Sequence, residues 1–159
     1  MKYYLIAASV FGLDEWLKRK AEKRQENGDR EVCFHRIILR KHHNKGFCLN
    51  RMDDKQPLVA ALSAALTTGL AFRIFHIRKD ASQRGYAMGL SLMLGGALSN
   101  TWDRLHRGYV VDYFSFQSKW KRLQDIIFNV SDLFIFLGAF IAVNFYQHNS
   151  RNHIRNRQI

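Results

Sequence analysis

The chain has 159 residues, enough for one compact unit, and its two cysteines are too few for a disulfide framework. Twenty-five Lys and Arg against thirteen Asp and Glu give a net charge of +12, which suggests an anionic partner such as nucleic acid or a phospholipid surface. The charges nevertheless avoid residues 57–72 and 85–102, and residues 126–150 carry only Asp132. A soluble nucleic-acid-binding protein would explain the charge but not these uncharged stretches, so we expect no nucleic-acid partner.

The first apolar run follows Lys2 and predicts a spanning helix over residues 2–18. It has no clear small-x-small cleavage site, and its apolar residues continue with helical spacing into Trp16, which suits a membrane interface. We therefore prefer an uncleaved helix to a secretory signal. A basic polar loop follows over residues 18–56, with a β-like run over residues 32–39.

Three further spans are predicted along the chain. The second covers residues 57–76 and begins at Pro57, a residue that the first turn of a helix tolerates. The third, residues 85–102, is rich in the small residues that pack helices in lipid. A charged and aromatic loop over residues 103–125 precedes the fourth span, residues 126–146.

These segments predict an all-α membrane protein with four transmembrane helices and a small β-containing extracytoplasmic loop region. Helices of about twenty residues match a hydrocarbon layer of roughly 30 Å. A soluble four-helix bundle is the alternative, but it would carry a charged stripe on each helix, and the second and third spans have none. We expect a single membrane-embedded domain over residues 1–159.

Acidic residues in or beside the spans are the candidate functional groups, because a charged side chain inside a membrane costs roughly 2.5 to 3.5 kcal/mol. Asp132 lies within the fourth span and has no basic residue within seven positions on either side. Asp112 follows a short apolar segment, residues 108–111, which we expect to turn back against the membrane surface.

Two of the acids follow an asparagine by three positions: Asn100 precedes Asp103, and Asn129 precedes Asp132. On a helix this spacing places amide and carboxyl on one face, where the amide can orient the acid. Asp103 also has a simpler interpretation, in which it pairs with the adjacent Arg104 at a helix end. The sequence leaves both open.

These residues carry a resemblance to a known family. The stretch GGALSNTWDRLHRGYVVD, from Gly95 to Asp112, is similar to the signature of lipoprotein signal peptidase (signal peptidase II), in which a Gly-Asn pair precedes Asp-Arg and then Val-Val-Asp-Phe. The stretch FNVSD, residues 128–132, resembles its second signature, Phe-Asn-x-Ala-Asp. DEWLK, residues 14–18, and NKG, residues 44–46, resemble its Asp-Gln-x-x-Lys and Asn-x-Gly elements.

The sequence departs from the family pattern at four places. Ser99 stands where the family has Gly, Ser131 where it has Ala, and Tyr113 where it has Phe. Phe47 follows Gly46 directly, where the family keeps small residues before its Phe. The last departure concerns the loop that would face the substrate.

The resemblance implies an aspartic endopeptidase of the bacterial plasma membrane that removes the signal peptide from prolipoproteins, just before a cysteine carrying a diacylglyceryl group. Asp112 and Asp132 would be its catalytic pair, because two close carboxyls cannot both ionise and can divide acid and base roles. The supporting residues that it implies are Asn100, Asp103, Arg104, Asn129, Asp14, Lys18, Asn44 and Gly46.

The resemblance also implies partners and a topology. We expect a monomer that uses no metal or other cofactor and contacts diacylated prolipoproteins and membrane phospholipid. The active site would lie near the extracytoplasmic face, although the two loops on that side hold seventeen Lys and Arg against eight elsewhere, opposite to the positive-inside tendency. The alternative is a catalytically altered relative that binds lipoproteins or anionic lipid through these basic loops without cleaving.

Overall fold

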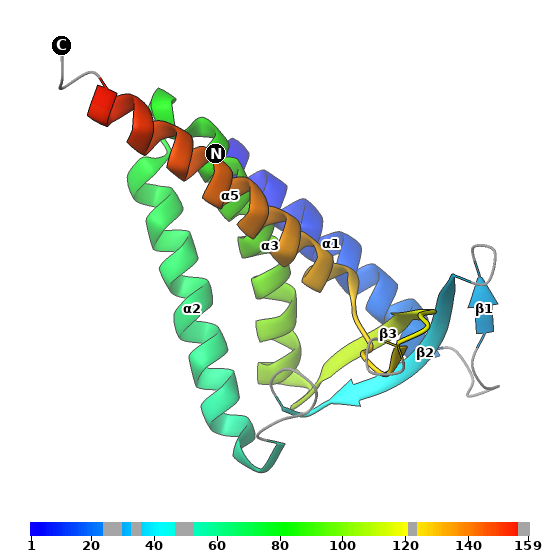
Figure 1. Ribbon diagram of the computed structural model, residues 1–159. Coiled ribbons are helices and arrows are strands. Elements are labelled where there is room, and N and C mark those ends of the chain that lie inside the picture. The colour runs from blue at the N-terminus through cyan, green and yellow to red at the C-terminus, as the bar shows by residue number, and fades with distance from the viewer. Residues whose placement is uncertain (24–29, 33–35, 47–52, 121–123, 156–159) are drawn as a thin grey trace.

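The described residues form four long helices and one small sheet (Figure 1). The computed structural model describes residues 1–23, 30–32, 36–46, 53–120 and 124–155. The elements in chain order are α1 (Lys2–Lys23), β1 (Arg30–Val32), β2 (Ile37–Asn44), η2 (Asp53–Lys55), α2 (Gln56–Ile77), η3 (Ala81–Gln83), α3 (Arg84–His106), β3 (Val110–Phe116) and α5 (Val130–Arg155). The chain is thus mostly helical, with its sheet at one end of the helices.

The four predicted spans each correspond to one long helix, with changed ends. The last helix begins at Val130 and not at residue 126, because Phe128 forms a β-bridge with Phe114. The Phe128 N–H donates to the Phe114 carbonyl at 2.7 Å, and the Phe114 N–H donates back at 3.1 Å. Pairing with β3 therefore holds the chain extended where the sequence predicted helix.

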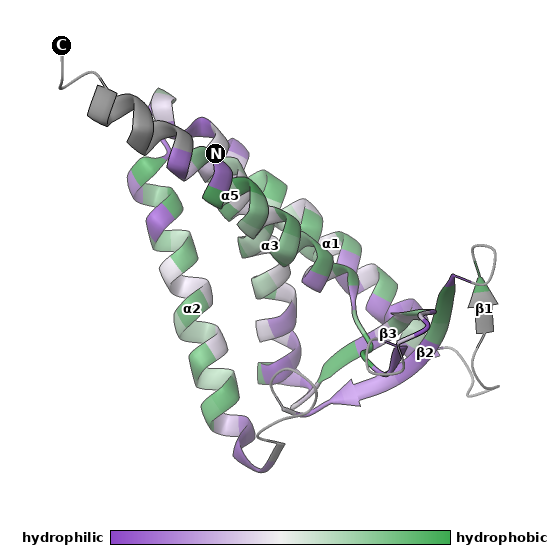
Figure 2. Ribbon diagram, in the orientation of Figure 1, coloured by the Kyte–Doolittle hydropathy of each residue, from purple (hydrophilic) through white to green (hydrophobic). Residues whose placement is uncertain are grey.

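Within the described part of the chain, two helices are long and apolar enough to cross a membrane: α2 and residues 130–147 of α5. Helices α1 and α3 are of similar length but carry charged residues toward one end, among them Lys18 and Asp103. Figure 2 shows this distribution, with hydrophilic residues at the helix ends nearest the sheet.

The sheet has three antiparallel strands in the order β1-β2-β3. The β-like run predicted over residues 32–39 is wrong as a single strand, since β1 ends at Val32 and β2 begins at Ile37; residues 33–35 lie outside the described part. The region of β3 was predicted only as a short apolar segment within a loop. Its valines and aromatic residues favour extended structure, and pairing with β2 satisfies its backbone.

Helix α3 is central and packs against α1, α2 and α5. Its approach to α5 is close: a Cβ added at Gly89 would lie 2.6 Å from the backbone oxygen of Gly138. The buried apolar core lies among the helix segments remote from the sheet and includes Ile74, Leu90 and Ala142. Buried polar residues instead gather at the sheet end of α1, α3 and α5.

Large apolar side chains are exposed along the outer surfaces of α2 and α5. They include Leu62, Leu66 and Phe72 on α2 and Phe136 and Phe140 on α5. Exposed large apolar side chains concentrated on two helices in this way are uncommon on a soluble monomer and suit contact with lipid.

Candidate active site

Asp112 lies in the middle of β3 and is buried, with 3% of its surface exposed. Across the sheet, Asn44 is paired in register with Val110, so that Asn44 and Asp112 are diagonal neighbours on one face. The Asn44 amide donates to Asp112 Oδ2 at 3.2 Å. The strand pairing therefore brings the Asn44 element of the first loop to this acid.

Asp132 lies in the first turn of α5 and is partly exposed. The backbone N–H of Asn129 donates to its Oδ2 at 3.1 Å, and the Asn100 side-chain amide donates to its Oδ1 at 3.0 Å. Partial positive charge at a helix N-terminus favours a carboxylate at this position.

One residue, Asn129, binds both acids. Its side-chain amide donates to Asp112 Oδ1 at 2.8 Å, while its backbone N–H donates to Asp132. The same amide also donates to Asn100 Oδ1 at 3.2 Å. Two acids twenty positions apart in the sequence are thus tied through a single buried asparagine.

Burial, and after it the negative charge of Asp132, together raise the pKa of Asp112 to about 7. The amides of Asn44 and Asn129 act against this shift but do not cancel it. At neutral pH Asp112 therefore holds a proton for much of the time, while its neighbour lies at a helix N-terminus that stabilises negative charge.

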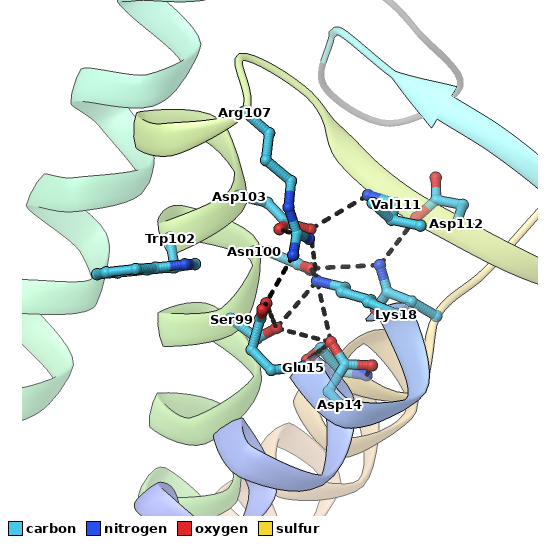
Figure 3. A network of polar contacts seen from close by, with 12 residues as sticks. Asp14, Glu15, Lys18, Ser99, Asn100, Trp102, Asp103, Arg107, Val111 and Asp112 are labelled. Atoms are coloured by element: carbon cyan, nitrogen blue, oxygen red, sulfur yellow. Dashed lines mark hydrogen bonds and ion pairs between the residues drawn. The ribbon is translucent and has the colours of Figure 1, made fainter. Parts of the chain in front are cut away.

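A buried lysine, Lys18 of α1, lies among the polar side chains of α1 and α3 (Figure 3). Lys18 is fully buried, and its Nζ lies 2.9 Å from Asp14 Oδ2 and 2.9 Å from Asp103 Oδ2. It also donates to Ser99 Oγ at 2.9 Å and to Asn100 Oδ1 at 3.0 Å. Because Lys18 occupies the oxygen side of the Asn100 amide, the nitrogen side is turned toward Asp132.

Asp103 is ion-paired, but not with Arg104 as the sequence left open. Its partners are Lys18 and Arg107, and its Oδ2 also accepts from the backbone N–H of Val111 at 3.2 Å. Adjacent residues on a helix point in different directions, whereas residues four apart share a face. Arg107 also pairs with Glu15 at 3.3 Å, which closes the cluster from the side of α1.

Arg104 instead faces the loop after β2. Its Nη2 donates to the carbonyl of Gly46 at 3.4 Å and its Nη1 to the carbonyl of Asn100 at 3.2 Å. Its buried Nε has no hydrogen-bond partner among the described residues. A buried N–H without a partner is a donor available to a further group.

All ten predicted site residues gather in this region. Sequence reasoning missed five contributors. Ser99, Ser131 and Tyr113 were noted only as small departures from a pattern, and Glu15 and Arg107 were not considered. The spacing of four between Asp103 and Arg107 was a signal for that pair. Among the described residues, no group of three or more His, Cys, Asp or Glu side chains is arranged to hold a metal ion.

An apolar cavity of about 450 Å³ lies between α1 and α3. Its lining includes Ala7 and Phe11 of α1 and Leu98, Trp102 and Leu105 of α3. Figure 3 shows Trp102 pointing away from the polar cluster, toward α2. The cavity therefore lies on a different face of α3 from Asn100.

Comparison with known proteins gives consistent matches over most of the chain. Residues 6–147 match the family described as Signal peptidase (SPase) II. A lipoprotein signal peptidase of Brevibacillus brevis is 31% identical over 144 residues, 90% of this chain and 93% of the relative. One from Halalkalibacterium halodurans is 29% identical over 141 residues, 87% of each chain.

Two solved structures share the fold, and both are described as structures of a bacterial membrane enzyme. One superposes with a TM-score of 0.76 at 21% identity and covers 95% of this chain and 90% of its own. The other has a TM-score of 0.74 at 24% identity and covers 89% of this chain and 90% of its own.

Proposed function

The chain belongs to the signal peptidase II family of proteases, and on that premise we propose that it removes the signal peptide from diacylglyceryl-modified prolipoproteins with Asp112 and Asp132 as an aspartic catalytic pair. The observation that carries this proposal is the attachment of both carboxyls to Asn129 at 2.8 and 3.1 Å. Two acids held by one residue can share a water and a proton.

In this mechanism Asp112 is the acid and Asp132 the base. The raised pKa of Asp112, caused mainly by burial, supports a protonated carboxyl there at neutral pH. The partial exposure of Asp132 and its place in the first turn of α5 support an ionised carboxylate that can meet water. The pair titrates as a unit, so these roles describe its dominant protonation state.

The reaction then proceeds without a covalent intermediate between enzyme and substrate. Asp132 takes a proton from water as the oxygen adds to the scissile carbonyl carbon, and Asp112 gives its proton to the carbonyl oxygen. When the C–N bond breaks, its electron pair leaves with the amine of the lipidated cysteine, and Asp132 returns the proton to that nitrogen. Asp112 recovers its proton as the carbonyl re-forms.

Arg104 and the residues beside it are proposed to hold the substrate backbone. The Arg104 guanidinium reaches Gly46 and has a buried Nε that no described residue engages, which supports donation to a substrate carbonyl. Asn44 and Asn100 keep the acids oriented. The apolar cavity between α1 and α3 is of a kind that accepts an acyl chain.

We further propose that the four helices all cross the bacterial plasma membrane as a single domain over residues 1–159. The exposed apolar surfaces of α2 and α5 support this, as does the fold shared with bacterial membrane enzymes. The sheet and the acids would lie at the extracytoplasmic face, where substrates arrive. A C-terminal tag protected from external protease in intact cells is the expected result.

Cleavage of a purified diacylated precursor tests the mechanism. Asp112→Asn and Asp132→Asn should each lower kcat by about 10⁴-fold or more, because either change removes an acid or base function. Asp125→Asn, at an exposed acid outside the site, is the matched control and should retain wild-type rates. Near-wild-type cleavage by either active-site variant would remove that residue from the mechanism. Binding of the precursor without cleavage by the wild-type protein would favour the non-catalytic alternative.

A further inference from the structure

The carboxylate of Asp14 on α1 is the point where α3, β3 and α5 meet. It is fully buried, and its Oδ2 accepts from Ser99 Oγ at 2.7 Å and from Ser131 Oγ at 2.6 Å. Its Oδ1 accepts from Tyr113 Oη at 3.0 Å and from the Ser131 backbone N–H at 3.3 Å. Together with Lys18, this makes five donors on one carboxylate of α1.

The three hydroxyls come from the three elements that carry the proposed catalytic machinery. Ser99 of α3 directly precedes Asn100, Ser131 of α5 directly precedes Asp132, and Tyr113 of β3 directly follows Asp112. The family pattern has Gly, Ala and Phe at these positions, none of which bears a hydroxyl. Three departures that looked unrelated in the sequence thus converge on one buried oxygen pair.

Tyr113 makes a second connection. Its hydroxyl donates to Asp14 and accepts the backbone N–H of Val130, the first residue of α5, at 3.0 Å. Burial raises the pKa of the Tyr113 phenol, and the charge of Asp14 adds to this, so the hydroxyl keeps the proton that it donates. The residue beside one acid is therefore fastened to the start of the helix that carries the other.

Ser99 makes the corresponding connection on α3. Its hydroxyl donates to Asp14 and accepts from Lys18 Nζ at 2.9 Å. Lys18 in turn donates to Asn100 Oδ1, and the Asn100 amide donates to Asp132. A hydrogen-bonded chain therefore runs from Asp14 to one of the two acids, and each link fixes the orientation of the next.

We propose that Ser99, Ser131 and Tyr113 are positioning residues, whose hydroxyls anchor α3, α5 and β3 to Asp14 and thereby set the relative placement of Asp112 and Asp132. This inference rests on the proposed function, because it concerns the catalytic pair named there. The hydroxyls touch neither acid; they act through the backbone segments that carry the acids and through Lys18.

The test replaces two of the three hydroxyl residues, Tyr113 and Ser131, by their nearest isosteres and measures kcat and KM separately on the diacylated precursor. Tyr113→Phe and Ser131→Ala should each lower kcat about tenfold with KM unchanged, as expected for one hydrogen bond to a buried charge. The double variant should lose less than the product of the two single losses, because both hydroxyls act on one carboxylate. Ser91→Ala is the control: Ser91 is a buried serine of α3 whose hydroxyl, among the described residues, bonds only the Ala87 carbonyl of its own helix.

Two results would overturn the proposal. One is a kcat within twofold of wild type in both single variants; the other is independent, fully multiplicative losses in the double variant. The Tm of each variant, measured in parallel, separates a positioning role from a purely structural one. If a variant has a lower Tm but its folded enzyme keeps the wild-type kcat, its hydroxyl only stabilises the fold. Asp112→Asn in the same assay keeps the two proposals apart. If it cleaves, the proposed function fails with this inference; if it is inactive and the hydroxyl variants are normal, only this inference fails.

Discussion

Replacing Asp112 by Asn should stabilise the protein at alkaline pH. Burial and the charge of Asp132 raise the pKa of Asp112 to about 7, against an ordinary value of 3.8. A group whose pKa is higher in the folded state stabilises the fold fully below the unfolded pKa, and this contribution is lost as pH rises through the folded pKa. Between pH 5 and pH 8 the wild-type protein should therefore lose about 2.5 kcal/mol that Asp112→Asn does not lose.

Thermal unfolding in detergent, followed by tryptophan fluorescence, measures this difference. A change of about 2.5 kcal/mol corresponds to roughly 5 to 10 °C in Tm for a chain of this size. Histidines and other groups that titrate in the same range are common to both proteins and cancel in the comparison. Asp125→Asn, at an exposed acid, should follow the wild type.

The reasoning is refuted if the Tm curves of wild type and Asp112→Asn run parallel from pH 5 to pH 8. Asp132→Asn refines the test, because it removes the nearby charge but leaves the burial. Since burial is the larger cause, that variant should keep most of the pH-dependent loss and shift it to lower pH.

Two other predictions concern the reaction and the helix packing. The kcat/KM of the wild type should fall about tenfold per pH unit above pH 7, because Asp112 loses its proton there. Asn44→Ala should move this alkaline fall to higher pH, because the Asn44 hydrogen bond lowers the pKa of Asp112. A pH–rate profile whose alkaline fall does not move in Asn44→Ala contradicts this prediction. Gly89→Ala should destabilise the fold by about 1 to 3 kcal/mol, because its Cβ would meet the α5 backbone at 2.6 Å. The control is Gly69→Ala on α2, whose Cβ would meet nothing within 4 Å and which should not lower Tm. Equal Tm values for the two variants would argue against the close contact between α3 and α5.

The helices could be predicted because hydrophobic runs of about twenty residues have few other stable forms. Their ends could not. The start of α5 depends on Phe128 pairing with Phe114, and this contact exists only once β3 has formed against β2. β3 itself was hidden because its seven residues lie inside a charged segment, and a short extended run gains its stability from long-range pairing.

The residues that form the site could be predicted because they lie in motifs. The hydrogen bonds and ion pairs that connect them could not. Nothing in the sequence shows that Asn129 binds both acids or that Asp103 prefers Lys18 and Arg107 to its neighbour Arg104. Such choices depend on the relative rotation of α1, α3 and α5, which packing decides and local spacing does not.

Five of the charges that weaken the membrane signal of α1 and α3 also build the site. Asp14, Glu15 and Lys18 of α1 meet Asp103 and Arg107 of α3 in one buried cluster, three acids against two bases. In lipid an isolated charge is costly, but paired and hydrogen-bonded charges facing a helix bundle carry much less of that cost. Low mean hydropathy in these two helices is therefore compatible with the proposed four spans. Because most charges of the site lie on α1 and α3, the two more apolar helices, α2 and α5, contribute only Asp132 to its ionisable groups.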